Sequence, residues 1–399
     1  MNITEMKSHS SLPGALFRQI PCINNFPFNA EVFDAWSRVG SGIGNEKSSV
    51  NSALGEYFER RHFYSEIFPE KRQKLQASLK EIEVESFFLA FSQTALNPAK
   101  PCEIRDHDFG TTAVTRVSDF SQCDIPTCLI SIAYQQGESD NHIYPSRDTC
   151  GCSFHASAER SIFGAIKEAL ERQFLARFWL TKKCNTELSP AEIDLSVSNS
   201  PAYPLYKALC KAGKIAAIDI SDHRFPGVCT LVVYGCPDNS RNVQFGAGMA
   251  YSETLTTALE KSIYELWQTF RFMDLFACLD LDPHDLKDPY LKHFLNCNNY
   301  QTYITLLDFK CSDCPCPPQS TIFDTSTLIA TLSQIDIEGY LYTKMQSISG
   351  YHFTFSKFIS PSLFLHMDNS KNINLNNKFS SDFLEDIYPD RLSTMVPFP

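Results

Sequence analysis

The amino-acid sequence predicts a mixed α/β fold (α+β) in which mixed or antiparallel sheets pack against long helices. Three segments have apolar residues at helical spacing and are long enough to be helices: Ser48–Phe68, Ser157–Leu180 and Glu253–Met273. Short runs rich in apolar and β-branched residues lie between them and predict strands. These runs are grouped at the spacing of hairpins, which favours a mixed or antiparallel sheet over strict alternation of strand, helix and strand.

The three predicted helices are amphipathic. Ser48 or Ser49 is placed to cap the first helix at its amino end. Each helix has an apolar stripe that we expect to face the core. The stripes consist of Val50, Ala53, Leu54, Tyr57 and Phe58, then Ile162, Ile166, Ala169, Leu170 and Phe174, and last Leu255, Ala258, Leu259, Ile263, Leu266 and Phe270.

Five runs are predicted to be strands, and one long stretch is predicted to be a loop. The loop is Asp368–Asp382, and no low-complexity linker divides the middle of the chain. We therefore expect an N-terminal segment, residues 1–40, followed by a single unit, residues 41–399, with a proline-rich tail. The predicted strands are Cys128–Tyr134, Ala216–Ile220, Cys229–Cys236, Glu338–Met345 and Ser360–Met367.

Composition and charge exclude several classes of protein. The chain has 399 residues, of which 43% are apolar, enough for a large core. Its formal charge of -11 argues against a general nucleic-acid binder, which needs a basic surface. No run approaches the roughly 18 apolar residues of a membrane span, and the N-terminus lacks the pattern of a secretory signal. We expect a cytoplasmic protein that binds neither nucleic acid nor membrane.

The cysteines are interpreted as free thiols. The chain contains 15 of them, an odd number that suits reduced thiols better than a disulfide framework. Cys311, Cys314 and Cys316 resemble part of a zinc site, with Cys150 and Cys152 as possible partners. Because the two groups lack the paired C-x-x-C spacing of structural zinc sites, we do not expect zinc here.

The pattern E-x-x-E-R occurs twice, in GEYFERRHF and in KEALERQF. Residues three and four apart share a helix face, so each copy places two carboxylates and a guanidinium together. The third predicted helix has a Glu and a Gln at the same spacing. Arg61 points away from the first face and is interpreted as an ordinary surface residue. The clustered residues are Glu56, Glu59 and Arg60, then Glu168, Glu171 and Arg172, and last Glu265 and Gln268.

A single E-x-x-E-R is usually a solvated ion pair that contributes roughly 0.3–0.5 kcal/mol. The matching contexts of the two copies favour a binding site instead. Bulky apolar residues surround both copies, and a fully solvated face would not need them. In addition, each long helix follows a segment rich in small or turn-forming residues: GSGIGNEKSS, DTCGCSFHAS and FGAGMAYSE.

Four carboxylates from two helices would repel one another strongly in a partly dry site. Divalent cations remove that cost, and carboxylates without thiol or imidazole partners suit Mg²⁺, which commonly shares the phosphate oxygens of a nucleotide. The neighbouring arginines suit phosphate oxygens as well. The pattern therefore predicts a Mg²⁺–nucleotide site. The sequence contains no G-x-x-x-x-G-K-[ST], so a conventional P-loop is excluded.

These motifs resemble those of the YcaO family. SGIGNEKSSVNSALGEYFER is similar to the first nucleotide-binding motif of the family, GCSFHASAERSIFGAIKEALERQF to the second and GAGMAYSETLTTALEKSIYELWQTFR to the third. The chain also ends in VPFP, similar to the proline-rich C-terminus of azoline-forming members. The match covers most of Ser41–Arg271 plus the tail. Within the family, the motifs look closest to the cyclodehydratase subunit of microcin-type thiazole/oxazole synthetases.

The resemblance implies a YcaO-type fold around an ATP site, and ATP-dependent formation of azoline rings in a ribosomally made precursor peptide. A Cys, Ser or Thr side chain attacks the preceding backbone carbonyl, ATP phosphorylates the resulting oxygen, and loss of phosphate leaves the ring. The implied Mg²⁺ ligands are Glu56, Glu59, Glu168 and Glu171. The implied nucleotide contacts are Ser52, Arg60, Arg172, Glu265 and Gln268, and the implied catalytic tail residues are Pro397 and Pro399.

The sequence departs from the family pattern at three places. Many members have a lysine in the first glycine loop, where this chain has Ile43. An Asn commonly precedes the glycine of the second motif, where this chain has Cys150. An arginine usually lies two positions after E-x-x-Q, where this chain has Phe270. The missing positive charge is expected from Lys47, Arg147 or Arg271.

Three further side chains have ordinary interpretations. His155 is interpreted as a hydrogen-bonded turn residue rather than a base that contacts substrate. Trp179 and Trp267 are interpreted as core residues rather than nucleotide stackers.

The resemblance to the family implies partner molecules and leaves two rival functions open. The partners are a precursor peptide with leader and core, a protein that grips the leader, since no room for a leader-binding domain precedes Ser41, and an FMN-dependent azoline dehydrogenase. One rival is a YcaO enzyme that makes a thioamide or an amidine with an external nucleophile. The other is a non-catalytic, nucleotide-bound scaffold of a modification complex. The terminal PFP favours azoline formation.

Overall fold

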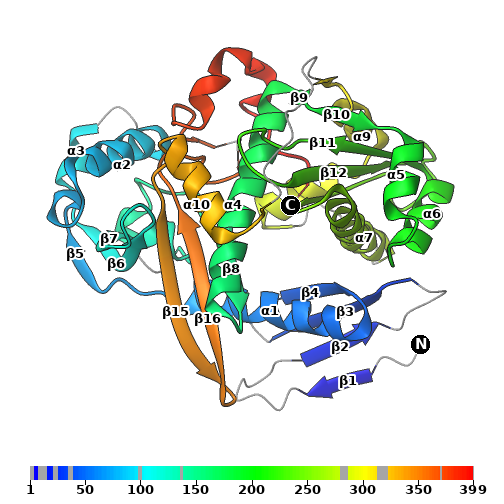
Figure 1. The fold of residues 1–399 in the computed structure, drawn as a ribbon, viewed down its shortest axis with the longest axis horizontal. Coiled ribbons are helices and arrows are strands. Elements are labelled where there is room, and N and C mark those ends of the chain that lie inside the picture. The colour runs from blue at the N-terminus through cyan, green and yellow to red at the C-terminus, as the bar shows by residue number, and fades with distance from the viewer. Residues whose placement is uncertain are drawn as a thin grey trace.

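The computed structural model describes residues 4–7, 16–20, 26–34, 39–97, 101–134, 138–278, 286–311, 322–368 and 371–398. It confirms the mixed α/β class, because helices and strands are interleaved along the chain (Figure 1). Within these residues, every strand pair is antiparallel except that of β9 (Lys183–Cys184) with β14 (Lys310–Cys311). The predicted preference for antiparallel or mixed sheets is therefore confirmed.

The strands form three larger sheets. The first is β1 (Thr4–Lys7), β2 (Leu16–Ile20), β3 (Phe28–Phe33) and β4 (Val39–Gly44). The second is β10 (Thr186–Leu188), β11 (Lys214–Asp219), β12 (Val228–Gly235) and β13 (Phe245–Ser252). The third runs in the order β5 (Lys71–Gln73), β6 (Phe109–Arg116), β15 (Tyr340–Ile348), β16 (Tyr351–Ile359) and β8 (Cys152–His155), and β7 (Gln122–Pro126) pairs with β6.

The helices fill the spaces between and around these sheets. The three long ones are α1 (Glu46–Ser65), α4 (Ala158–Thr181) and α7 (Leu255–Cys278). The shorter ones are α2 (Glu81–Thr94), α3 (Pro101–Asp106), α5 (Pro190–Val197), α6 (Tyr203–Ala212), α8 (Pro289–Asn296), α9 (Tyr300–Leu306) and α10 (Thr325–Gln334). In the described part of the chain, no helix is both long and apolar enough to cross a membrane.

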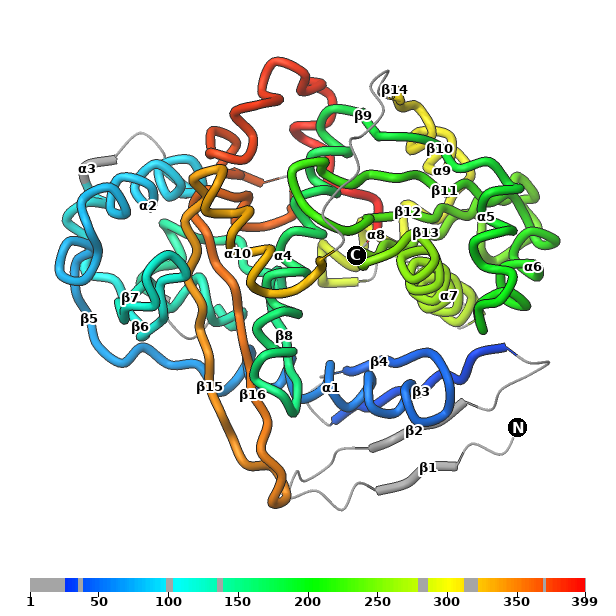
Figure 2. Tube along the Cα trace, viewed as in Figure 1, coloured from blue at the N-terminus to red at the C-terminus, as the bar shows by residue number. Residues whose placement is uncertain are grey.

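Helix α4 passes through the middle of the molecule (Figure 2). The six-stranded sheet and α2 lie to one side of it, and the sheet of β10–β13 with α5, α6 and α7 lies to the other (Figure 1). The apolar residues of α4 belong to the main core, together with those of β11, β12, β13 and α7. Helix α1 packs on β3 and β4 through a small separate cluster that includes Ala53 and Tyr57. The strands that precede the three long helices, β4, β8 and β13, therefore lie in three different sheets.

All three predicted long helices are confirmed, with small shifts at their ends. Ser157 caps α4, and its side chain accepts a hydrogen bond from the Arg160 amide. The predicted cap of α1 was wrong, since Asn45 fills that position and its side chain accepts from the Ser48 amide at 2.9 Å. Asn is as good a cap as Ser, and the helix begins two residues before the predicted start.

Three of the five predicted strands are confirmed, as β11, β12 and β15. Cys128–Tyr134 was wrong as a strand: it begins in a 3₁₀ turn, in which the Ile130 and Ser131 amides donate to the Thr127 carbonyl. Its apolar pattern comes from burial on all sides and not from pairing. Ser360–Met367 was also wrong: the strand of that hairpin is β16, which ends at Ile359.

Side chains bind the backbone of Ser360–Met367 in place of a neighbouring strand. The Phe364 amide donates to Gln173 Oε1 at 2.8 Å, and the Leu365 amide donates to Asn374 Oδ1 at 3.0 Å. The described part of the predicted loop Asp368–Asp382 contains turns and one 3₁₀ segment, as expected. The boundary proposed after residue 40 lies within β4, which pairs with β3. That boundary stays a prediction.

Candidate active site

Each of the three motifs consists of a strand followed at once by a long helix: β4 and α1, β8 and α4, β13 and α7. The small-residue segments that precede the helices contain these strands. The sequence did not predict β4 and β13 as strands, because glycine is depleted in strands and lowers the strand propensity of any run that contains it. The glycines themselves were the available signal, since a glycine within a strand often marks a close approach of another backbone.

Glycines bring α1 and α7 into close contact with their strands. A Cβ at Gly42 of β4 would lie 1.9 Å from the Ser49 carbonyl oxygen. A Cβ at Gly248 of β13 would lie 2.1 Å from the Leu266 amide nitrogen. Neither distance is sterically possible, so both positions require glycine at this packing distance. The short separation places carboxylates on the helices within reach of strand amides.

Three of the glutamates are held by these strand amides. Glu56 Oε2 accepts from the Ser41 amide at 2.8 Å, and Glu265 Oε2 accepts from the Met249 amide at 3.0 Å. Glu171 of α4 reaches across to β13, where its Oε2 accepts from the Tyr251 amide at 2.6 Å. Charge-assisted bonds of this kind fix the direction of a carboxylate. The second and third motifs are thereby joined.

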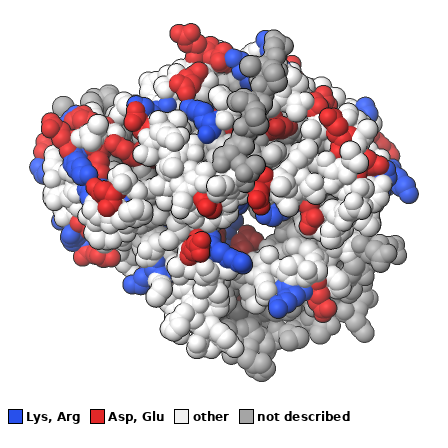
Figure 3. All heavy atoms as spheres, in the orientation of Figure 1, with Lys and Arg blue, Asp and Glu red and all other residues white. Residues whose placement is uncertain are grey.

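A further hydrogen bond joins the first motif to the third. Gln268 Nε2 in α7 donates to Ser41 Oγ in β4 at 3.3 Å. The structure therefore brings together the elements that carry all three motifs. The face shown in Figure 3 has a hollow near its middle, with acidic and basic side chains around it.

Both arginines of the E-x-x-E-R copies lie beside their glutamates. Arg60 is 3.3 Å from Glu56, and Arg172 is 3.6 Å from Glu168. Burial opposes the charge of Arg172, but Glu168 and then Glu265 raise its pKa. This guanidinium therefore interacts electrostatically with glutamates on both α4 and α7. It stays charged at any physiological pH.

The carboxylates are costly to ionise in the absence of a further cation. Burial raises the pKa of Glu59 to about 8, with Glu168 and Glu56 adding to the effect and Arg60 opposing it. Burial likewise raises the pKa of Glu168 to about 7 and that of Glu265 to about 7. Desolvation and mutual repulsion are the two causes that disfavour a negative charge. A ligand that brings positive charge removes both costs.

The residues fit a Mg²⁺–nucleotide complex. The donors are carboxylate oxygens, and among the described side chains Glu168 Oε2 is buried without a hydrogen-bond partner. No three His, Cys, Asp or Glu side chains of the described ranges are grouped as a ready-made metal site. Mg²⁺ usually takes one or two carboxylates plus substrate phosphates rather than an all-protein cage. Glu56, Glu59, Glu168 and Glu171 would hold the metal.

Of the predicted nucleotide contacts, Ser52 lies next to one of these carboxylates, whereas Lys47 and Arg147 lie away from them. Ser52 is exposed one turn before Glu56 on the same helix face. Lys47 is exposed in the first turn of α1, about 14 Å along the helix axis from Glu56 at 1.5 Å per residue. Arg147 donates to the Ala133 carbonyl and to Asn141 Oδ1. Their roles at the nucleotide, and that of Arg271, stay predictions.

Two lysines that sequence reasoning missed lie among the glutamates. Lys167 Nζ in α4 is 3.0 Å from Glu171 Oε2. Lys357 in β16 is buried, donates to the Asp148 carbonyl at 3.0 Å and lowers the pKa of Glu59 against the effect of burial. Lys167 directly precedes Glu168 in KEALER, so its position was a usable signal. Lys357 lies outside all three motifs, and no sequence signal pointed to it.

The C-terminal tail is packed and not frayed. Met395, Val396 and Phe398 are buried, and the Trp179 indole in α4 donates to the Thr394 carbonyl at 2.8 Å. His293 in α8 bonds to the Val396 carbonyl at 3.3 Å. Pro397 is buried with them, while Pro399 lies outside the described residues. The tail is thus attached to the same helix that carries Glu168 and Glu171.

The ordinary interpretations also stand. His155 Nδ1 accepts from the Ser157 amide at 2.8 Å, which makes it a turn residue at the start of α4. Trp179 is buried, and Trp267 packs against the main core and stacks on Phe270. Every cysteine that the structure characterises is a free thiol, including Cys150, Cys152 and Cys311. Cys314 and Cys316 lie outside the described residues.

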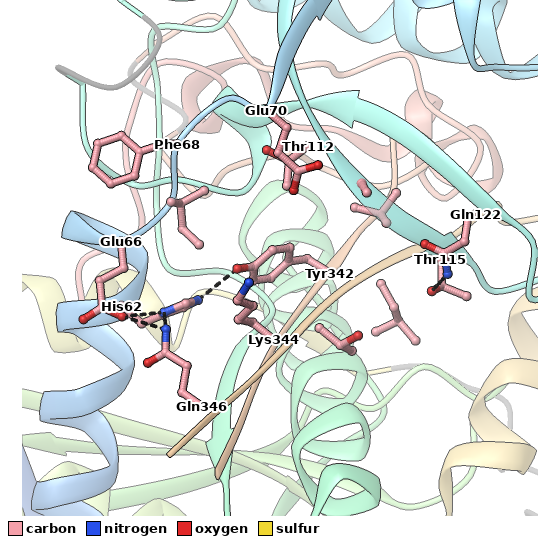
Figure 4. Close-up of a pocket in the computed structure, with 15 residues that line it drawn as sticks. His62, Glu66, Phe68, Glu70, Thr112, Thr115, Gln122, Tyr342, Lys344 and Gln346 are labelled. Carbon is pink, nitrogen blue, oxygen red and sulfur yellow. Dashed lines mark hydrogen bonds and ion pairs between the residues drawn. The ribbon is translucent and has the colours of Figure 1, made fainter. Parts of the chain in front are cut away.

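A cavity of about 360 Å³ lies elsewhere, beside the last two turns of α1 (Figure 4). His62, Glu66, Tyr342 and Gln346 line it and form one hydrogen-bonded network. It contains none of the residues that the sequence assigned to the site.

Comparison with known proteins decides the family. The family model for YcaO cyclodehydratases, described as ATP- and Mg²⁺-binding, matches residues 39–344. The chain belongs to the YcaO family. Microcin B17-processing protein McbD of Escherichia coli is 32% identical over 395 residues, which cover 98% of this chain and 98% of McbD.

Two solved structures are similar to this chain. The E. coli microcin synthetase McbBCD complex contains a chain that matches all of this one over its own whole length, with TM-score 0.89 and 32% identity. A heterocyclase in complex with substrate and cofactor is 14% identical, with TM-score 0.69 over 96% of this chain and 54% of that one, and shares the fold. The YcaO chain described here is therefore an ATP-dependent, Mg²⁺-binding cyclodehydratase.

Proposed function

We propose that this YcaO protein forms thiazoline and oxazoline rings from Cys, Ser and Thr residues of a ribosomally made precursor peptide. The observation that carries the proposal is the convergence of α1, α4 and α7, which places glutamates from all three helices beside Arg60 and Arg172. When bound, ATP supplies the phosphoryl group that turns the amide oxygen into a leaving group, and Mg²⁺ offsets the phosphate charge.

The residues of the chain then have separate roles. Glu56, Glu59, Glu168 and Glu171 hold the metal, and Arg60 and Arg172 bind phosphate oxygens through the guanidinium fork. Glu265 orients the site by binding the Met249 amide, and Gln268 does so by binding Ser41. Ser52, Lys47 and Arg147 complete the nucleotide contacts. These groups are positioned before the reaction, so their dipoles and charges need little reorganisation during it.

We propose that Pro397 and Pro399 of the tail act at the reacting peptide, with the terminal carboxylate moving a proton. Helix α8 supports this role, because it contacts the tail through His293 and carries Tyr290 one turn earlier. Tyr290 is 46% exposed, and Arg172 is close enough to oppose the rise in the tyrosine pKa that partial desolvation causes. The tail and the arginine of the second motif thus meet the same short helix.

We propose three partners. They are the precursor peptide with its leader and core, a protein that grips the leader, and an FMN-dependent dehydrogenase that oxidises the azolines. The support is that the matching E. coli structures are of a McbBCD complex, one of them with pro-MccB17 bound. We further propose a cytoplasmic location, where free thiols such as those of this chain are maintained.

Replacing Glu171 by Gln tests the site. We expect ATP turnover by the reconstituted complex to fall by about 100-fold or more, since one fixed charge at the phosphates is lost. The fold is expected to persist, because the Gln amide oxygen still accepts from the Tyr251 amide. Glu159→Gln, in the exposed first turn of the same helix, is the control. Wild-type turnover in Glu171→Gln would remove this residue from the metal site.

Deleting Pro397–Pro399 tests the tail. We expect binding of an ATP analogue to survive, and the precursor to keep its full mass instead of losing one water per ring. Because Phe398 is buried, thermal unfolding is measured in parallel. Phe398→Ala keeps both prolines and separates lost packing from lost chemistry. Ring formation at the wild-type rate by the deletion variant would show that the tail is not catalytic.

A further inference from the structure

Lys167 is the lysine most closely bound to the carboxylate cluster. Its Nζ is 3.0 Å from Glu171 Oε2 and 3.2 Å from the Tyr251 carbonyl oxygen. Glu171 Oε2 also accepts from the Tyr251 amide at 2.6 Å. The ammonium, the carboxylate and one residue of β13 therefore form a closed ring of hydrogen bonds that joins α4 to the third motif. Only 21% of the lysine side chain is exposed.

The two E-x-x-E-R copies provide an internal comparison. The residue directly before the first glutamate is Gly55 in GEYFER and Lys167 in KEALER. Glu171, the second glutamate of the second copy, therefore has a lysine one turn before it, whereas Glu59 of the first copy does not. The cations that act on Glu59 are Arg60 and Lys357. A lysine four residues before a glutamate lies on the same helix face, one turn away. The asymmetry is thus a direct result of one sequence difference.

A fixed ammonium changes how many divalent cations the cluster needs. Buried carboxylates that converge must be neutralised, and each additional positive charge reduces the demand for metal. Lys167 binds only Oε2 of Glu171, so within the described residues Oε1 is left for a ligand. The positive charge next to Glu171 is built into the protein, whereas at Glu59 and Glu168 much of it must be brought in by a metal.

We propose that the Lys167 ammonium takes the place of one divalent cation in the carboxylate cluster and holds Glu171 in position for the nucleotide. This inference rests on the proposed metal role of the four glutamates. Lys167 is a positioning residue in this account, since it acts through Glu171. The cluster then requires fewer metal ions than its number of carboxylates suggests.

Counting bound Mg²⁺ tests the proposal. The full chain, with its partners where it needs them, is dialysed to equilibrium with Mg²⁺ and a saturating non-hydrolysable ATP analogue. We expect Lys167→Met to hold one more Mg²⁺ per chain than the wild type. At limiting Mg²⁺ we expect its affinity for the analogue to fall at least about tenfold and to recover in excess Mg²⁺, because loss of a close cation weakens anion binding.

Further variants separate charge from structure. Lys167→Gln keeps a donor toward Glu171 and removes only the charge, so it should behave like Lys167→Met even if the latter folds poorly. Lys167→Arg keeps the charge and should hold the wild-type number of ions. Lys182→Met is the control, since Lys182 is similarly buried, with 15% of its side chain exposed, and pairs with Asp308 at 2.9 Å far from the cluster.

The outcomes are distinguishable. If the Met and Gln variants hold the same number of Mg²⁺ as the wild type and bind the analogue equally well at limiting Mg²⁺, the inference about Lys167 is wrong and the proposed metal site stands. If the wild type itself binds the analogue without any dependence on Mg²⁺, the proposed metal ligands are wrong, and the inference about Lys167 is overturned with them.

Discussion

Helices α1 and α4 carry the same E-x-x-E-R pattern after a strand, yet the protein surrounds the two copies differently. In α1, the side chains of Arg60 and Glu56 are 34% and 36% exposed, whereas in α4 those of Arg172 and Glu168 are 21% and 23% exposed. Helix α4 crosses the main core, while α1 packs on a small sheet at the edge (Figure 1). The difference indicates that α4 is the rigid half of the site and α1 the accessible half.

The two strand–helix units, β4 with α1 and β8 with α4, achieve close packing in opposite ways. In the first, the strand provides the glycines, and Gly42 of β4 faces the backbone of α1. In the second, the helix provides the glycine, and Gly164 of α4 faces the side chain of Ser153 in β8. A backbone oxygen cannot move without moving the helix, whereas a serine hydroxyl can rotate away. The same substitution should therefore have very different costs in the two units.

The largest expected effect comes from Gly42→Ala. Its Cβ would lie 1.9 Å from the Ser49 carbonyl oxygen, so β4 and α1 must separate. We expect a loss of about 3 kcal/mol or more in the free energy of unfolding, at the upper end for overpacking. The Cβ of Gly164→Ala would meet the Ser153 side chain, with Oγ at 2.4 Å and Cβ at 3.3 Å. This substitution should be nearly neutral, because alanine favours a helix by about 1 kcal/mol over glycine. Denaturant unfolding of both variants measures the contrast, and equal losses would contradict it.

The next effect compares the two arginines. Removing Arg172 leaves the partly buried Glu168 and the nearby Glu265 uncompensated, so we expect Arg172→Met to cost about 2 kcal/mol. The Arg60 pair is more exposed, and we expect Arg60→Met to cost about 0.5–1 kcal/mol. Arg172→Lys is the control: it keeps the positive charge but loses the planar guanidinium, so it separates the loss of charge from the loss of side-chain shape. The measurement is unfolding by denaturant without Mg²⁺. A larger loss of unfolding free energy in Arg60→Met than in Arg172→Met would contradict the assignment of α4 as the more buried half of the site.

The smallest effect is a dependence of stability on pH. Burial raises the pKa of Glu59 from 4.5 to about 8 and that of Glu168 from 4.5 to about 7. The folded state therefore holds these protons more tightly than the unfolded state. The stabilisation is fully present below about pH 4.5 and is lost as the pH rises through the folded pKa values. Fully dry carboxylates with these pKa values would lose roughly 3–4 kcal/mol between about pH 6 and 8 without Mg²⁺. Because both side chains are partly exposed to solvent, we expect the free energy of unfolding to fall by only about 1 kcal/mol.

Two variants separate the contributions to that pH dependence. Glu59→Gln should remove the part that extends to about pH 8, and Glu168→Gln the part that ends near pH 7. Mg²⁺ with an ATP analogue should flatten the wild-type curve, because a bound cation lowers the pKa of a carboxylate. Stability that rises with pH in the metal-free wild type would show that these carboxylates are not destabilised by burial.

Much of the site was predictable because the helices were. The apolar stripes of α1, α4 and α7 repeat at the helical period over about two to four turns, and the i, i+3 and i+4 positions of these helices determine which carboxylates share a face. Strands were harder. Cys128–Tyr134 has a strand-like composition but bonds locally, and β13 contains two glycines that lower its strand propensity. A short apolar run does not distinguish burial from pairing.

By itself, the sequence determined the local arrangements: three long helices, a pair of carboxylates with an arginine on two of them, and the family to which such motifs belong. Only the tertiary structure decided which groups meet. It brought Glu171 to the amide of Tyr251, Gln268 to Ser41, and Lys357 from outside the motifs toward Glu59. The reason is physical, since helical periodicity acts over four residues, whereas these contacts depend on how closely glycines let helices approach strands distant in the chain.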